Sequence, residues 1–231
     1  MERVTLEPAL LLHRRPYRDT SQLLEVLTET HGRIGLVARG RRGAAALQLF
    51  QPLLLSWTRR GELGTLGATE VDGPEHRLEG RRAVCGLYMN ELLIRGLARD
   101  DPHPEVVVAY RTALVALADG AEEWDTLRRF ELALLDGLGF GLDLVHDATG
   151  GEPVRAGSRY LFVQHQGIVR TTLTDGSVDG AHLLALAAGD PVEGSGRGAI
   201  RRIITEALGQ IIGDRPLHSR RLLEQPGACT E

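Results

Sequence analysis

Residues 13–60 read HRRPYRDTSQLLEVLTETHGRIGLVARGRRGAAALQLFQPLLLSWTRR, and this stretch decides how the rest of the chain is interpreted. It holds nine arginines against three acids, Asp19, Glu25 and Glu29, so its local charge is 9 − 3 = +6 in a chain of formal net charge −4. Short runs of alternating apolar residues lie between the arginines, a pattern typical of β-strands. A small β-domain with a basic rim favours binding of a polyanion, and single-stranded nucleic acid is the first candidate.

The positive charge is confined to this part of the chain. Residues 1–80 hold 11 arginines and 10 acids, residues 81–150 hold 7 and 12, and residues 151–231 hold 9 and 9, which gives +1, −5 and 0. Lysine is absent from the sequence, and arginine suits phosphate contact because its planar guanidinium donates two hydrogen bonds at once. With 231 residues, 42% of them hydrophobic, the chain can bury the core of one large domain or two small ones.

Five strand candidates lie in the first third of the chain, at residues 4–12, 22–28, 33–39, 53–58 and 63–71. In the third of them, Ile34 and Ala38 point one way while Arg33 and Arg39 point the other. These two arginines are therefore expected on one exposed face, roughly 20 Å apart at about 3.3 Å per residue. Five short strands in so short a stretch predict a small closed barrel of the OB type.

After Pro74 the apolar spacing changes from alternating to helical. Helical stripes begin at Cys85, Val107 and Leu127, and a hairpin is expected from residues 160–164 and 168–173. A short helix at 181–188, a loop at 194–198 and a buried helix at 199–212 follow. The predicted fold class is α+β, with a five-stranded OB-fold barrel in residues 1–80 and a mainly α-helical domain with a small β-hairpin in residues 81–231.

Nothing in the sequence predicts a metal ion, a cofactor or a catalytic site. Cys85 and Cys229 are far apart, the eight histidines are scattered, and neither an HxxxH nor a CxxC pair occurs. Ser195 lacks the GxSxG turn of a nucleophile, and the glycines around it lack the GxxxxGK[ST] pattern of a phosphate loop. The N-terminus does not resemble a signal peptide and no apolar run approaches about 18 residues, so we expect a soluble, cytoplasmic protein.

Six blocks of sequence carry a resemblance to a known family. They are LHRRPYRDTS (12–21), GRIGLVARGRR (32–42), LQLFQPLLLSWTRRGELGTL (47–66), GLYMNELLIRGL (86–97), LRRFELALLDGLGFG (127–141) and RPLHSRRLL (215–223). In content, order and spacing the chain resembles the RecO recombination-mediator family over nearly its whole length. The resemblance implies an N-terminal OB-fold, a helical domain, and a role in DNA repair and recombination without enzymatic turnover.

The same resemblance implies partners. Members of the family bind single-stranded DNA, anneal complementary strands, contact the acidic C-terminal tail of single-stranded DNA-binding protein (SSB), and act with RecR to help RecA load onto coated DNA. We therefore expect a cytoplasmic protein that works at the nucleoid. Many members carry a four-cysteine zinc site after the helical block, but residues 145–151 read VHDATGG here, so no structural zinc is expected.

Eight arginines are the candidate DNA contacts. The first choices are Arg33, Arg39, Arg41 and Arg42, and the second choices are Arg14, Arg15, Arg59 and Arg60. A guanidinium can pair with phosphate and can also stack on an unpaired base, whereas internal ion pairs are the alternative reading. Of the nearby aromatic residues, Tyr17 is a candidate for base stacking, while Trp57 alternates with leucines and is expected in the core.

A second candidate site takes the acidic SSB tail. Its residues are Arg128, Arg129, Leu132 and Leu135. A cationic rim beside an apolar groove is what an acidic peptide with an aromatic end requires. In the alternative, Arg128 pairs with Glu131 within the same helix, and Arg129 pairs likewise with Asp125.

Two other classes of function remain open at this point. A metal-dependent nuclease would need converging carboxylates, and the middle of the chain offers Asp100, Asp101, Glu122, Glu123 and Asp125. These acids lie at expected helix starts, where capping and the helix dipole account for them. A sequence-specific DNA-binding regulator would need a basic recognition helix in a helix-turn-helix, and the sequence predicts none.

Overall fold

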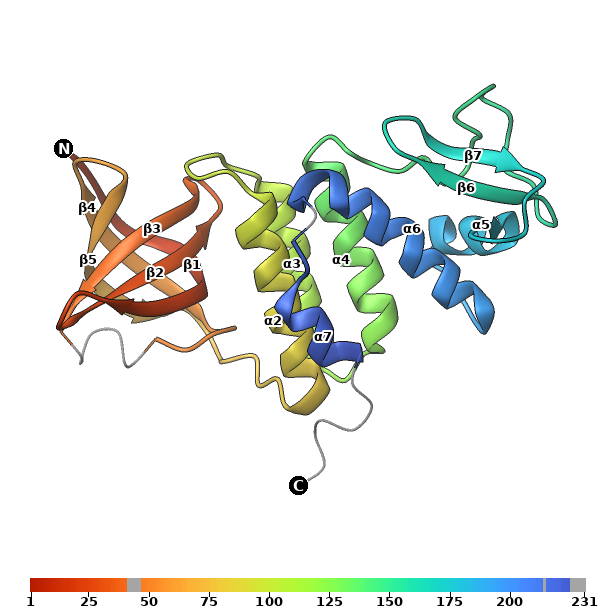
Figure 1. Ribbon diagram of the computed structural model, residues 1–231. Coiled ribbons are helices and arrows are strands. Elements are labelled where there is room, and N and C mark those ends of the chain that lie inside the picture. The colour runs from red at the N-terminus through yellow and green to blue at the C-terminus, as the bar shows by residue number, and fades with distance from the viewer. Residues whose placement is uncertain (41–46, 214, 225–231) are drawn as a thin grey trace. The chain divides into compact units, whose positions relative to one another are not determined.

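The computed structural model describes residues 1–40, 47–213 and 215–224 (Figure 1). These residues form two compact units. One unit holds Met1–Thr126 and the described residues from Pro216 onward, and the other holds the described residues of Leu127–Arg215. Within the described residues, none of the helices is both long and apolar enough to cross a lipid bilayer.

A closed five-stranded barrel begins the first unit (Figure 1). Its strands are β1 (Glu2–Tyr17), β2 (Ser21–Thr28), β3 (Gly32–Arg39), β4 (Pro52–Arg59) and β5 (Leu63–Val71). The order is β1-β2-β3-β5-β4, β4 pairs back with β1, and only the short β3–β5 pairing among these is parallel. The predicted OB-type barrel is therefore confirmed.

The inside of the barrel follows the predicted alternation. Ile34, Leu36 and Ala38 point inward and are at most 2% exposed, and Trp57 joins them in the core at 2% exposed, as expected. β1 is longer than its apolar pattern suggested, because it bends at bulges and pairs with β2 along one stretch and with β4 along another.

The outer face of β1 and β2 is buried as well. Leu10, Leu12, Leu23 and Leu27 are buried although they lie outside the cluster that fills the barrel. β1 packs against α2 (Gly80–Gly96) and β2 packs against α3 (Pro104–Ala118). The continuous apolar run at the end of the predicted first strand therefore reflects burial on both sides.

A buried polar chain joins the barrel to these two helices. Leu12 lies where the β1–β2 register shifts, and its carbonyl oxygen accepts a hydrogen bond of 2.8 Å from Asn90 Nδ2 of α2. The hydroxyl of Tyr110, on α3, donates to Asn90 Oδ1. Asn90 is 2% exposed and Tyr110 is fully buried, so this chain satisfies polar groups that water cannot reach.

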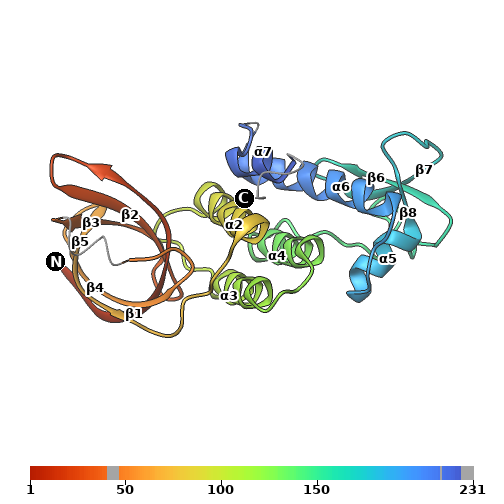
Figure 2. The same cartoon turned by 90° about the horizontal axis from the view of Figure 1, so that it is seen from below.

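The short helix α7 (His218–Glu224) lies beside α2 (Figure 2). Glu91 Oε1 accepts the backbone N–H of His218 at 2.9 Å, and Glu91 Oε2 accepts both the backbone N–H and the hydroxyl of Ser219 at 2.9 and 2.6 Å. Burial acts to raise the pKa of Glu91, but these hydrogen bonds outweigh it and the pKa is lowered. The sequence did not predict α7, because seven residues are too few to show a helical period.

Helix α4 (Glu123–Gly137) begins in the first unit and continues in the second. The second unit adds β6 (Arg159–Val163), β7 (Gly167–Thr171) and β8 (Val178–Asp179), a three-stranded sheet of order β7-β6-β8. The predicted hairpin is confirmed as β6 and β7, whereas the two-residue β8 was not predicted. Helix α5 (Gly180–Ala188) confirms the expected short helix.

Helix α6 (Ser195–Ile212) starts earlier than predicted. The expected loop at residues 194–198 is wrong from Ser195 onward, because Gly194 takes the N-cap position and the next residues form the first turn. Gly196 is there for packing, since a Cβ at this position would lie 2.5 Å from the His182 ring. A glycine-rich sequence therefore marks a close approach of two helices.

Residues 145–151, where no zinc was expected, are ordered by two carboxylates. Asp143 Oδ1 accepts the backbone N–H groups of Val145 and His146 at 2.9 and 3.0 Å. Asp147 accepts the backbone N–H groups of Thr149 and Arg170 at 2.9 and 3.3 Å. These contacts tie the segment to its own turns and to β7.

Candidate nucleic-acid interface

One end of the barrel brings three strands together at an arginine-rich surface. The strand register places Tyr17 opposite Ser21, and Ser21 opposite Arg39. Two strand spacings separate Tyr17 from Arg39, or about 10 Å. Gly40 donates its N–H to the Thr20 carbonyl at 3.0 Å, so the chain leaving β3 stays beside the β1–β2 turn.

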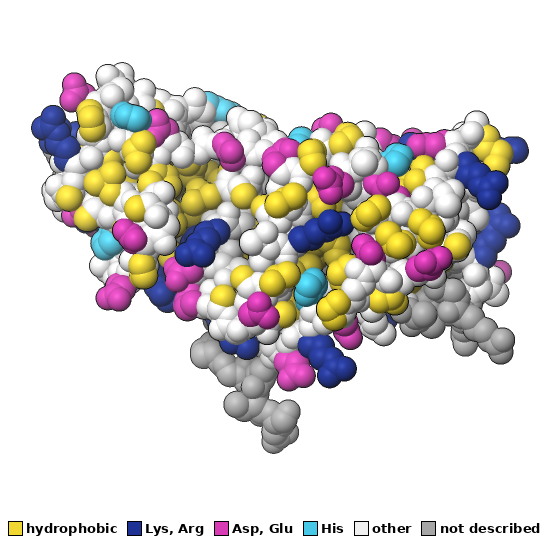
Figure 3. Space-filling view, turned by 180° about the vertical axis from the view of Figure 1, so that it is seen from behind, with side chains coloured by type: hydrophobic (Ala, Val, Ile, Leu, Met, Phe, Trp, Pro, Cys, Tyr) yellow, Lys and Arg dark blue, Asp and Glu magenta, His cyan; other side chains and the backbone are white. Residues whose placement is uncertain are grey.

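We name this surface the basic corner, defined by Arg14, Arg15, Arg18 and Arg39. All four arginines are exposed. The face of the molecule shown in Figure 3 carries arginine side chains among acidic and apolar ones, with several at its right-hand edge. The guanidinium carbon of Arg18 lies 5.2 Å from the centre of the Tyr17 ring, a cation–π contact. The basic corner therefore offers several cations and one aromatic ring on a short length of surface.

The basic corner has an outer and an inner side. Arg15 pairs across the strands with Leu23, and Arg39 pairs with Ser21, so both lie on the outside of the barrel. Arg14 pairs with Leu24, which is a member of the barrel core, so Arg14 lies on the inner side at the open end. Its Nη1 donates to the Leu47 carbonyl at 3.2 Å.

The expectation that Arg33 shares an exposed face with Arg39 is wrong. The Arg33 side chain is only 13% exposed, and its Nη1 lies 2.8 Å from Glu25 Oε2. Its Nε donates to the Leu97 carbonyl at 3.0 Å, because the loop after α2 runs along β3 and also pairs with it near Arg99. Arg33 therefore joins the barrel to the α2–α3 loop.

Arg59 is also engaged inside the first unit. It forms ion pairs with Glu2, at 2.9 Å, and with Asp100. The hydrogen bond to Asp100 is the main reason that the pKa of Arg59 is raised, against the opposing effect of burial. Arg60 is exposed, and its Nη2 lies 3.5 Å from the sulfur of Met1.

The eight candidates therefore do not form one surface. Glu2 pairs with Arg59 at the start of β1, whereas Tyr17 ends the same strand. Arg59 and Arg60 thus lie at the opposite end of β1 from the basic corner. Arg41 and Arg42 lie outside the described residues. The candidate set also missed Arg18. Its position next to Tyr17, the candidate for base stacking, could have indicated it.

The four candidates for binding the acidic tail also divide into buried and exposed residues. The Arg128 side chain is 6% exposed and its Nη2 lies 2.5 Å from Glu131 Oε1, which confirms the predicted pairing within the helix. Leu135 is fully buried, whereas Leu132 is partly exposed. Arg129 is exposed and donates to the Gly189 carbonyl at 3.4 Å. Only Arg129 and Leu132 of this set present surface.

The acids considered for a nuclease are used in local contacts. Asp100 pairs with Arg59, and Asp101 lies 3.2 Å from a nitrogen of His103. Glu122 Oε2 accepts the backbone N–H of Asp125 at the start of α4, and Glu123 pairs with Arg81 at 2.8 Å. In the part of the chain that the structure describes, no group of three or more His, Cys, Asp or Glu side chains could hold a metal ion.

A closed OB barrel with an arginine-rich end, followed by helices, places the protein in the OB-fold class, whose members commonly bind nucleic acids. The chain belongs to the RecO family. Residues 1–73 match the family model described as Recombination protein O N terminal, and residues 77–221 match the one described as Recombination protein O C terminal.

Several curated relatives bear the name DNA repair protein RecO. The one from Azoarcus sp. (strain BH72) is 38% identical over 235 residues, which cover 97% of each chain. The one from Alkalilimnicola ehrlichii is 42% identical and covers 97% of this chain and 92% of its own, and the one from Nitrosococcus oceani is 42% identical, with 96% and 94% covered. A role in DNA repair and recombination follows from this membership.

Proposed function

We propose that this protein is a recombination mediator that binds single-stranded DNA at the basic corner, anneals complementary strands and, with RecR, helps load RecA onto SSB-coated DNA. It acts at the nucleoid, in the cytoplasm, and without catalytic turnover. The observation that carries the DNA-binding part is the gathering of four exposed arginines at one end of an OB barrel.

The chemistry of the basic corner suits a strand with no preferred sequence. Arginines contact phosphates, which every nucleotide carries, and the ring of Tyr17 adds a surface on which a base can stack. The candidates Arg41 and Arg42 follow Arg39 and Gly40 in the sequence and remain proposed DNA contacts. Because phosphate contacts release counterions, affinity falls as salt rises.

The proposed tail site is reduced to Arg129 and Leu132, the members of the candidate set that present surface. Arg129 supplies a cation for the acidic residues of the SSB tail, and Leu132 supplies apolar contact. Capture of the tail raises the local concentration of the barrel near exposed DNA, so neither contact has to be tight by itself.

Fluorescence anisotropy of a labelled oligonucleotide over a salt series tests the proposal. The variant combines Arg15→Glu, Arg18→Glu and Arg39→Glu, and we expect a loss of affinity of at least about tenfold and a salt slope smaller by about 2, at about 0.7 per phosphate contact. The matched control combines Arg170→Glu, Arg201→Glu and Arg202→Glu, three exposed arginines of the second unit with the same change of charge. Equal losses in both proteins would overturn the assignment of the basic corner.

The tail contact is tested separately with a labelled acidic peptide that ends in phenylalanine. Arg129→Glu is expected to abolish binding of the peptide and to leave oligonucleotide affinity unchanged. Unaltered peptide binding would remove Arg129 from the proposed site.

A further inference from the structure

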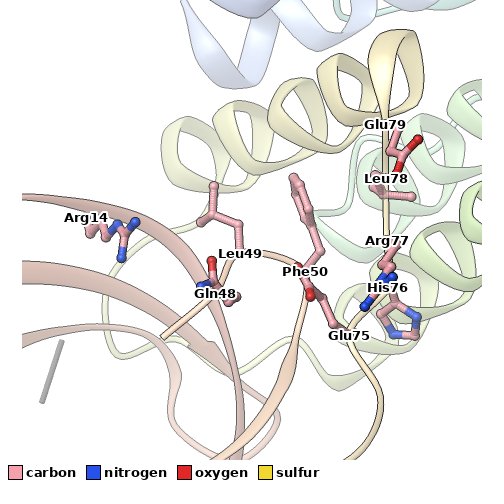
Figure 4. Close-up of a pocket in the computed structure, with 9 residues that line it drawn as sticks. All are labelled: Arg14, Gln48, Leu49, Phe50, Glu75, His76, Arg77, Leu78 and Glu79. Carbon is pink, nitrogen blue, oxygen red and sulfur yellow. The ribbon is translucent and has the colours of Figure 1, made fainter. Parts of the chain in front are cut away.

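A cavity of about 480 Å³ opens on the inner side of the basic corner (Figure 4). Arg14 lines it from the end of β1, residues 48–50 line it from the segment that enters β4, and residues 75–79 line it from the connection between β5 and α2. His76 donates its backbone N–H to the Phe50 carbonyl at 3.2 Å, so these two segments run side by side. The cavity is thus built by backbone contacts within the first unit.

One wall of the cavity is held rigidly. Phe50 is buried in a left-handed conformation, with φ of 64°, and its side chain points toward α2 (Figure 4). A Cβ on Gly86 of α2 would lie 2.7 Å from the Phe50 ring, so ring and helix are in close contact. This contact keeps the cavity open, because Phe50 cannot turn into it without leaving α2.

The lining combines apolar walls with balanced polar groups. Leu49 and Leu78 supply apolar surface, and Gln48 supplies an amide that both donates and accepts. Burial lowers the pKa of His76, against the opposing charge of Asp119, so the imidazole is neutral at neutral pH.

The formal charges of the lining cancel, since it holds two arginines, Arg14 and Arg77, and two glutamates, Glu75 and Glu79. A phosphate in the cavity would meet two carboxylates. A neutral planar heterocycle fits better, because carboxylates accept hydrogen bonds from amino and imino groups while guanidinium groups donate to ring carbonyls and ring nitrogens.

The position of Arg14 connects the cavity to the basic corner. Arg14 belongs to both, and it precedes Tyr17 by three residues, or about 10 Å along an extended strand. Arg15 follows Arg14 in β1 and lies on the outer side, so the cavity lies next to the surface proposed to hold the phosphates of a bound DNA strand. We propose that the cavity takes one unstacked nucleobase of that strand, with apolar contact from Leu49 and Leu78 and hydrogen bonds from the polar lining.

This inference rests on the proposed DNA binding, and two probes distinguish base binding in the cavity from DNA binding at the basic corner. They are a labelled oligonucleotide and an abasic deoxyribose-phosphate oligomer of the same length and charge. We expect the protein to bind the oligonucleotide more tightly by about fivefold or more, the lower end of what one base contact contributes. Equal affinity for both probes would overturn the cavity and leave the basic corner standing, whereas binding of neither would mean that the proposed DNA binding itself has failed.

A substitution that fills the cavity provides a second test. Gln48→Trp places a large ring at the mouth, and its control Gln164→Trp makes the same change at an exposed residue of β6–β7. Gln48→Trp is expected to remove the preference for the base-containing probe and to keep the affinity for the abasic oligomer. A preference that survives Gln48→Trp would place the base elsewhere.

A cross-linking measurement on the unaltered protein keeps the inference testable if Gln48→Trp does not fold. An oligonucleotide containing 4-thiothymine is irradiated in complex with the protein, and the linked peptides are mapped. We expect links within residues 48–50 or 75–79. Links confined to other segments would overturn the proposal.

Discussion

The buried chain from Leu12 through Asn90 to Tyr110 predicts a large effect of one nearly isosteric substitution. Asn90→Leu removes the donor to the Leu12 carbonyl and the acceptor of the Tyr110 hydroxyl, and both groups stay buried. Removing one partner of a buried hydrogen bond costs about 1–3 kcal/mol. Some of this cost is offset by the added apolar side chain, so we expect the free energy of unfolding to fall by about 2–4 kcal/mol.

The assay is equilibrium unfolding in urea, followed by circular dichroism. Tyr110→Phe alone, and combined with Asn90→Leu, completes a double-mutant cycle. Because the double variant lacks both partners of the Tyr110–Asn90 hydrogen bond, it should be less destabilised than the sum of the single variants. The burial that raises the pKa of Tyr110 keeps its hydroxyl protonated, so the effect should persist into alkaline solution.

Two outcomes would refute this reasoning. If Asn90→Leu lowers the stability by less than about 0.5 kcal/mol, as at an ordinary surface site, Leu12 and Tyr110 do not depend on Asn90. If the effects of the two single variants simply add, the hydroxyl and the amide are not coupled.

Three further changes have defined outcomes. Because the pKa of Glu91 is lowered in the folded protein, its contacts with α7 stabilise the fold above about pH 4.5. This stabilisation is lost as the pH falls through the folded-state pKa of Glu91. Glu91→Gln should therefore reduce the loss of stability with falling pH, measured as the free energy of unfolding. Gly32→Ala should destabilise by more than about 2 kcal/mol in urea unfolding, because Gly32 has φ of 64° and a Cβ would lie 2.2 Å from the Asp101 carbonyl oxygen. Arg59→Ala should lower stability through its lost ion pairs and leave oligonucleotide affinity unchanged in anisotropy, whereas Arg39→Ala should lower the affinity. Matching losses of affinity for the two arginine variants would contradict the division between the ends of β1.

The elements of the fold were predictable where the periodicity was long. Alternation over the seven residues 33–39 predicted β3, and helical stripes predicted α2 and α3. Elements too short to repeat a period, such as β8 and α7, were missed. The first turn of α6 was mistaken for a loop because glycine signals flexibility in a sequence, whereas Gly196 is required by the His182 ring of another helix.

The sequence predicted the type of candidate site but not the residues that form it. The sequence by itself determined that an OB barrel carries an excess of arginine, because strand period and local charge are properties of neighbouring residues. Only the tertiary structure decided which arginines face solvent. Arg33 pairs with Glu25 of the neighbouring strand β2, Arg59 pairs with carboxylates from two segments distant in the sequence, and Arg128 is buried with Glu131. The sequence determines where charged residues occur along the chain. Whether an arginine can bind a ligand depends on which opposite charges the fold brings within a few ångströms of it.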